Sequence, residues 1–105
     1  MIENNDIPLF SDIDKLIHEP ARLLIMSFLY VVKNCDFQFL MVQTSLTKGN
    51  LSSHLSKLED AKYIFIEKKF KGKKPYTIIS LTDDGRKAYA LYRKDMDKLF
   101  SKFQE

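Results

Sequence analysis

One stretch, residues 45–76, constrains the fold most, because it joins a helix with regularly spaced leucines to a lysine-rich hairpin. Spacings of four and three residues put these leucines on one face of a helix. They are Leu51, Leu55 and Leu58. Thr47 is a favourable N-cap, since its hydroxyl can accept an otherwise unpaired amide hydrogen in the first turn. The spacing therefore predicts a helix over residues 47–62.

The face away from the leucines is thin and rich in hydrogen-bonding groups, with acids only at Glu59 and Asp60 near its end. A helix that enters a DNA major groove about 12 Å wide needs this character. An ordinary solvated face is the alternative, although such faces usually carry more Glu and Lys than Ser, Asn and Gly. The residues expected to approach DNA are Lys48, Gly49, Asn50, Ser53, His54 and Lys57.

The hairpin supports the same interpretation. Residues 64–66 begin a strand rich in β-branched and aromatic side chains, and residues 76–81 form a second strand. We expect a short exposed loop between them, over residues 67–75, which carries Lys68, Lys69, Lys71, Lys73 and Lys74. Clustered lysines repel one another, but they suit phosphate contacts, where each neutralised phosphate releases a counterion. Protection of a sheet edge is the alternative role for a lysine-rich hairpin.

The order of these elements resembles a known family. The runs LTKGNLSSHLSKLEDAKYI and KKFKGKKPYTIISLTDDG are similar to the winged helix-turn-helix domain of MarR- and ArsR-like bacterial and archaeal repressors. The matching positions are Ser52, Ser53, His54 and Leu55 in the recognition helix, and Leu81, Thr82 and Gly85 after the wing. Lys62 stands where the family usually has glycine, so a less tight turn is expected after that helix. The resemblance covers residues 11–99.

The resemblance implies a mostly helical α+β fold, the winged helix-turn-helix, in one domain over residues 1–105. We expect an arm over residues 1–10, a short helix capped by Ser11 or Asp12, and a second helix from Pro20 to about Lys33. A short strand or bend then precedes a third helix, which Asp36 caps and which ends near Thr44. The recognition helix, the two wing strands and a final helix starting at Thr82 complete the order.

Two features predict a homodimer. The second helix is apolar nearly all round, and one small domain is expected to leave part of this apolar surface uncovered. The final segment, 82–105, carries an aromatic stripe at a/d-like spacing, typical of an interface. The expected dimer interface contains Ile13, Leu16, Ile17, Tyr89, Tyr92, Met96, Leu99, Phe100 and Phe103. A final helix folded back on its own domain is the alternative.

Charge is uneven along the chain, although the net charge is only +3. Residues 1–19 hold five acids and one base, whereas residues 48–74 hold eight lysines and three acids. Such concentration is expected of a nucleic-acid-binding face. The sequence therefore predicts a repressor-like, sequence-specific regulator that binds double-stranded DNA as a homodimer. A winged-helix module that binds protein instead is the alternative, although such modules usually lose the basic wing.

Motifs for catalysis or for cofactor or metal binding are absent from the sequence, which has no C-x-x-C, H-E-x-x-H or G-x-G-x-x-G. We therefore expect no enzyme activity and no cofactor. The lone Cys35 fits a reducing cytoplasm, and no apolar run reaches the roughly 18 residues of a membrane span. The resemblance allows a small-molecule effector pocket between the DNA-binding core and the dimer helices, although no residue set indicates one.

Overall fold

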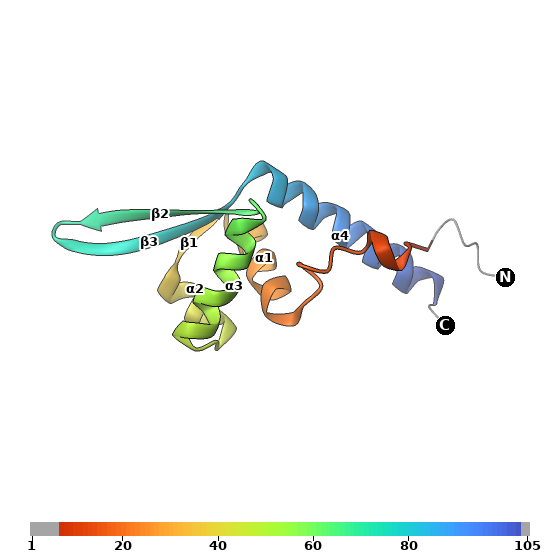
Figure 1. Cartoon of the computed structure of the whole chain (residues 1–105), viewed down its shortest axis with the longest axis horizontal. Helices are drawn as coiled ribbons and strands as arrows, with labels where there is room; N and C mark the ends of the chain where they lie inside the picture. The colour runs from red at the N-terminus through yellow and green to blue at the C-terminus, as the bar shows by residue number, and fades with distance from the viewer. Residues whose placement is uncertain (1–6, 104–105) are drawn as a thin grey trace.

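The elements follow the order of a winged helix (Figure 1), in a computed structural model that describes residues 7–103. The four α-helices of the described chain are α1 (Pro20–Val32), α2 (Phe37–Thr44), α3 (Lys48–Asp60) and α4 (Asp83–Lys102). The strands are β1 (Asn34–Asp36), β2 (Ile64–Lys71) and β3 (Lys74–Leu81). The predicted α+β class and winged-helix order are confirmed. The predicted arm lies largely outside the described residues.

The first predicted helix, however, is wrong. In its place the chain forms a short 3₁₀ helix, η2 (Phe10–Asp12), followed by a single turn. The reason is Asp14, whose Oδ1 accepts the backbone amides of Leu16 and Ile17 at 3.0 Å each. A side chain that takes these amides competes with the helical backbone pattern. The described chain therefore has four α-helices instead of the five expected.

Helix starts were well marked by the sequence. Asp36, Thr47 and Thr82 each accept an amide hydrogen in the first turn of α2, α3 and α4, at 2.7, 3.2 and 2.9 Å. The predicted caps at Asp36 and Thr47 are confirmed, and Thr82, predicted as the start of the last helix, is its N-cap. Glu19 caps α1 in the same way, through the amide of Arg22 at 2.8 Å, and was not predicted. Pro20 occupies the first position of α1, where its missing amide hydrogen costs nothing.

The turn after α3 keeps its tight form despite Lys62. That residue adopts φ +64°, in the left-handed region that favours glycine. The turn is closed by two amide-to-carbonyl bonds, from Lys62 to Glu59 at 2.9 Å and from Tyr63 to Leu58 at 3.0 Å. The expectation of a looser turn is therefore wrong, and the lysine backbone bears a strain of roughly 1 kcal/mol that glycine would not.

The three strands form an antiparallel sheet in the order β1-β3-β2. Wing strands pair from Ile64 with Leu81 out to Lys71 with Lys74, leaving only Gly72 and Lys73 in the turn. Gly72 has φ +66°, as a glycine at the first position of a two-residue hairpin loop requires. The predicted loop over 67–75 is therefore mostly strand, because this tight turn lets pairing continue through the lysines.

The core lies between α1, α3, the sheet and the first part of α4. The predicted leucine face of α3 is confirmed, since Leu51, Leu55 and Leu58 are all buried. Tyr89 and Tyr92 of α4 are also buried in the same protomer. The hydroxyl of Tyr89 lies 2.7 Å from that of Ser27 in α1, and the hydroxyl of Tyr92 lies 2.6 Å from Nδ1 of His18.

The molecule is elongated, with principal extents of 62 × 25 × 21 Å. Its radius of gyration is 16.0 Å, whereas a compact domain of this length has about 13 Å. Figure 1 shows the reason, because the wing and the C-terminal part of α4 extend from opposite ends of the body. The outer part of the wing and the C-terminal part of α4 therefore extend beyond the core and are largely exposed to solvent.

Gly85 in the first turn of α4 gives a test of this packing. A Cβ there would clash with the backbone carbonyl of Tyr63, which cannot rotate away. We predict that Gly85→Ala lowers the free energy of unfolding by about 2–3 kcal/mol, the upper range for overpacking, in chemical denaturation. Gly49→Ala is the control, because nothing lies within 4 Å of its Cβ position, and alanine favours a helix by up to about 1 kcal/mol. Equal stability of Gly85→Ala and the unchanged protein would contradict the described packing.

Candidate nucleic-acid interface

A groove of about 1250 Å³ lies between the wing and the N-terminal half of α3. It is bordered on one side by Lys48 and Ser52 of α3, and on the other by the outer half of the hairpin. The full lining comprises Asp36, Phe37, Gln38, Lys48, Ser52, Lys68, Lys71, Lys74, Pro75, Tyr76 and Thr77. Residues from the predicted recognition helix and the predicted wing therefore share one concave surface.

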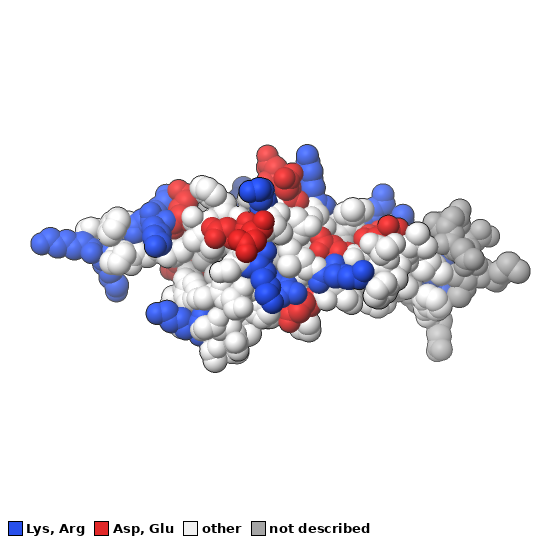
Figure 2. Space-filling model, viewed as in Figure 1, with Lys and Arg blue, Asp and Glu red and all other residues white. Residues whose placement is uncertain are grey.

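The groove is strongly positive. Four lysines line it, one from α3 and three from the wing, against one acid, Asp36. The Asp36 carboxylate is already engaged, because it caps α2 through the amide of Phe39. Lys69 and Lys73 are exposed on the same hairpin outside the groove lining. Figure 2 shows Lys and Arg atoms gathered over the free end of the wing, with Asp and Glu atoms nearer the middle of the molecule.

The solvent face of α3 carries the small polar side chains that the sequence indicated. Gly49, Asn50, Ser53 and Lys57 are all exposed. The Thr47 cap fixes the first turn, and the free amides of a helix N-terminus add a partial positive charge at this end. The helix therefore offers a basic, donor-rich start.

His54 differs from these neighbours, because its side chain is only 20% exposed and contacts α1. Its Nδ1 lies 3.1 Å from Nη1 of Arg22, whose Nε donates to the Leu16 carbonyl at 2.6 Å. A guanidinium can only donate, so Nδ1 accepts in this contact. The carboxylate of Glu19 lies 3.8 Å from the same nitrogen. His54 thus braces the flank of α3 against α1.

Glu19 carries the negative charge of this small cluster. Partial burial alone would raise the pKa of its carboxyl, but amide hydrogen bonds from Arg22 and Ala21 outweigh burial. The positive charge of nearby Arg22 acts in the same direction, so the pKa of the carboxyl lies below its usual value. The carboxylate is therefore ionised at neutral pH, at the N-terminus of α1.

Seven groove residues were not among the predicted DNA-binding residues, and Ser52 and Tyr76 are two of them. Ser52 lines the groove one helical turn after Lys48, so its i+4 spacing was a usable signal. Tyr76 pairs across the hairpin with Lys69. Its place depends on the register set by the two-residue turn, whereas the sequence predicts a longer loop there.

The predicted dimer residues fall into three groups. Ile17, Tyr89, Tyr92 and Met96 are buried within the protomer, and Ile13, Leu16 and Leu99 pack partly against the same core. Phe100 and Phe103 are 68% and 59% exposed. The first part of the aromatic stripe is therefore buried in the protomer's own core, whereas its last two residues are exposed to solvent.

Other chemistry finds little support. Burial, aided by the charge of Asp36, raises the pKa of the Cys35 thiol to about 11, so it stays protonated at neutral pH. Among residues 7–103 no cluster of His, Cys, Asp and Glu is placed to hold a metal ion. Within the same range, no helix combines the length and apolarity needed to cross a bilayer.

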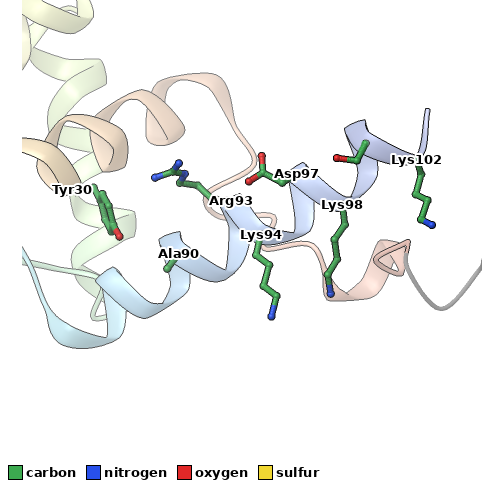
Figure 3. A pocket seen from close by; sticks show the side chains of 8 residues that line it. Tyr30, Ala90, Arg93, Lys94, Asp97, Lys98 and Lys102 are labelled. Carbon is green, nitrogen blue, oxygen red and sulfur yellow. The ribbon is translucent and has the colours of Figure 1, made fainter. Parts of the chain in front are cut away.

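A second, smaller groove of about 520 Å³ runs beside α4, next to Tyr30 (Figure 3). Arg93 and Asp97 point to one side of the helix in this view, and Lys94 and Lys98 to the other. This surface of α4 lies on the far side of the molecule from the wing tip (Figure 1). Its lysines are thus basic residues remote from the first groove.

Comparison with known proteins decides the family. A family model described as a winged helix DNA-binding domain matches residues 21–100. The chain belongs to this winged-helix family. It is 35% identical over 78 residues to an uncharacterised protein of Methanocaldococcus jannaschii, a match that covers 74% of this chain and 85% of the relative. The winged-helix identification made from the sequence is confirmed.

Solved structures agree on the fold. A transcriptional regulator homologue from Pyrococcus horikoshii OT3 has a TM-score of 0.83 and 25% identity, over 88% of this chain and 91% of that one. NadR in complex with 4-hydroxyphenylacetate has a TM-score of 0.69 at 20% identity, over 86% and 66% of the two chains. Overoxidized AbfR bound to DNA has a TM-score of 0.67 at 19% identity, over 83% and 64%.

Proposed function

We propose that this protein is a homodimeric, repressor-like transcriptional regulator that binds double-stranded DNA in a sequence-specific way. The observation that carries the proposal is the positive groove shared by Lys48 and three wing lysines. Membership of the winged-helix DNA-binding family supports it. So does the likeness to a protein described as a transcriptional regulator homologue and to one whose structure contains DNA. A cytoplasmic location follows from this role.

In this proposal α3 enters the major groove. Asn50 and Ser53 read base edges, Gly49 allows close approach, and Lys57 lies further along the same exposed face. Lys48 contacts the backbone. His54 takes a supporting role, because its ring is held by Arg22, and it keeps the flank of α3 fixed against α1. Side chains that both donate and accept suit base edges, whereas ammonium groups suit phosphates.

The wing supplies non-specific affinity. Its lysines, Lys68, Lys69, Lys71, Lys73 and Lys74, lie along the phosphate backbone next to the major groove, with the tip near the minor groove. Each phosphate contact makes the slope of log K against log salt concentration more negative by about 0.9. The wing lysines also protect the edge strand β2 from pairing with other chains. If that were their only role, DNA affinity would not depend on them.

Dimerisation places two such surfaces side by side. Phe100 and Phe103 are exposed at the end of α4. The η2 segment, which carries the exposed Phe10, lies toward the same end of the molecule (Figure 1). We propose that these aromatics form the two-fold interface, with Ile13, Leu16 and Leu99 beside them and the buried members of the stripe supporting it from within. Two recognition helices then meet half-sites about 34 Å apart on a pseudo-palindromic operator.

The wing lysines give the first test of this function. We predict that the double change Lys73→Ala, Lys74→Ala weakens binding to all duplexes and reduces the slope of log K against log salt by roughly one unit per lost contact. Fluorescence anisotropy at several salt concentrations measures both quantities on random duplex DNA. The control is Lys94→Ala, Lys98→Ala, which removes the same charge from α4 (Figure 3).

The base-reading residues should behave differently. Asn50→Ala or Ser53→Ala should lower the preference for a selected operator over random DNA and leave the salt slope unchanged. Equal losses on both duplexes would contradict base reading by α3. Absence of salt-sensitive binding by the unchanged protein at micromolar concentration would reject the DNA-binding function and favour a protein-binding module.

The dimer is tested by changes at the end of α4. We predict that Phe100→Glu combined with Phe103→Glu converts a dimer of twice the 12.3 kDa chain mass into a monomer, because two charges would be buried in an apolar interface. Light scattering after size-exclusion chromatography measures the mass. Leu91→Glu is the control, since Leu91 is also exposed on α4, at 57%, but lies outside the proposed interface. An unchanged protein that is already monomeric would contradict the proposed assembly.

A further inference from the structure

The tip of the wing carries an aromatic side chain that the phosphate contacts do not explain. Phe70 is 71% exposed, four residues beyond the half-buried Ile66 on the same strand. Every residue from Lys68 to Tyr76 is exposed, so this outer part of the hairpin packs on nothing in the described protomer. An aromatic ring left in water contributes little to folding, and its apolar surface remains available for an interaction.

The strand register determines on which face of the hairpin the side chain of Phe70 lies. Side chains alternate between faces along a strand, so Phe70 shares a face with Lys68, Ile66 and the buried Ile64. Its partner across the hairpin is Pro75, which lines the groove together with Lys48 and Lys68. Phe70 and Pro75 are therefore adjacent apolar groups on the wing face that gives Lys68, Pro75 and Thr77 to the groove. Phe70 itself lies outside the groove lining, nearer the tip.

The charges around this apolar pair identify its partner class. Lys69 and Lys71 flank Phe70 in sequence, and Lys74 flanks Pro75. An apolar protein surface would have to desolvate several of these ammonium groups without compensation. A nucleic acid neutralises these ammonium groups with its phosphates. It also offers an apolar site, namely the space between stacked bases. The minor groove, about 6 Å wide, admits a single side chain or a narrow ribbon tip.

We propose that Phe70, backed by Pro75, is a wedge that enters the minor groove beside the proposed major-groove site, unstacks one base step and bends the DNA. This inference rests on the proposed function, and adds to it a way of reading sequence through deformability. Apolar wedges in the minor groove partly unstack base steps and kink the duplex. Pyrimidine–purine steps such as TA unstack most easily, so operators should place such a step under each wing tip.

The experiment uses the full chain and a random-sequence duplex of about 40 base pairs, long enough for a bend to change the end-to-end distance. Donor and acceptor dyes at the two ends report bending. In parallel duplexes, a fluorescent adenine analogue at a TA step brightens when the step unstacks. Binding is followed separately by anisotropy at several salt concentrations, and bending is compared only at saturation.

We expect the unchanged protein to raise energy transfer and brighten the analogue. Phe70→Ala should bind roughly tenfold more weakly, as for loss of one base–aromatic stack, with the salt slope unchanged and both bending signals largely lost. Phe70→Leu should keep part of both signals, because leucine is also an apolar wedge. Phe65→Ala is the matched control, since Phe65 is an exposed aromatic on the opposite face of the same strand, and it should behave as the unchanged protein.

Two results would overturn the wedge alone: salt-sensitive binding by the unchanged protein without either bending signal, or bending signals in Phe70→Ala equal to those of the unchanged protein. Both leave the proposed function standing. Failure of the unchanged protein to bind any duplex would overturn the wedge together with the function. Thermal unfolding of Phe70→Ala should differ little from that of the unchanged protein, because the side chain of Phe70 is 71% exposed.

Discussion

The geometry of the whole molecule depends on the junction at Tyr63. Its amide donates to Leu58 at the end of α3, and its carbonyl accepts from Thr82 at the start of α4, both at 3.0 Å. Its hydroxyl donates to the carboxylate of Asp14 in the N-terminal segment. Burial, the Asp14 hydrogen bond and the charges of Asp14 and Asp84 raise the pKa of Tyr63 to about 12, so this donor persists at all physiological pH.

That junction explains how two distant surfaces keep a fixed relation. The end of α3, the start of β2 and the start of α4 meet at this junction. The backbone of Tyr63 occupies the space that a Cβ of residue 85 would need, so only glycine fits there. The angle between the basic groove and the free end of α4 is thereby set inside one protomer. A two-fold contact at that end would then set the separation of two recognition helices without further adjustment.

Much of this arrangement was readable from the sequence because it is local. The leucine spacing of α3, the caps at Asp36 and Thr47 and the start of α4 at Thr82 depend only on near neighbours, and all were predicted. Competing contacts, both local and non-local, caused the errors. The Asp14 side chain replaces helical bonding in the N-terminal segment, which also engages Tyr63, and the core of one protomer takes Tyr89 and Tyr92. For the site, composition identified the lysines, but the hairpin register placed Tyr76 and Pro75 at the groove, and that register came from a two-residue turn.

The central claim is that α3 and the outer wing act as one DNA-binding surface. Backbone amide chemical shifts recorded during titration with duplex DNA test this most directly, because each residue reports separately. We predict that the amide signals of residues 48–53 and 68–77 shift together at the same fraction of bound DNA, while those of residues 90–98 in α4 do not shift. Shifts confined to one of the two elements, or strongest along α4, would contradict it.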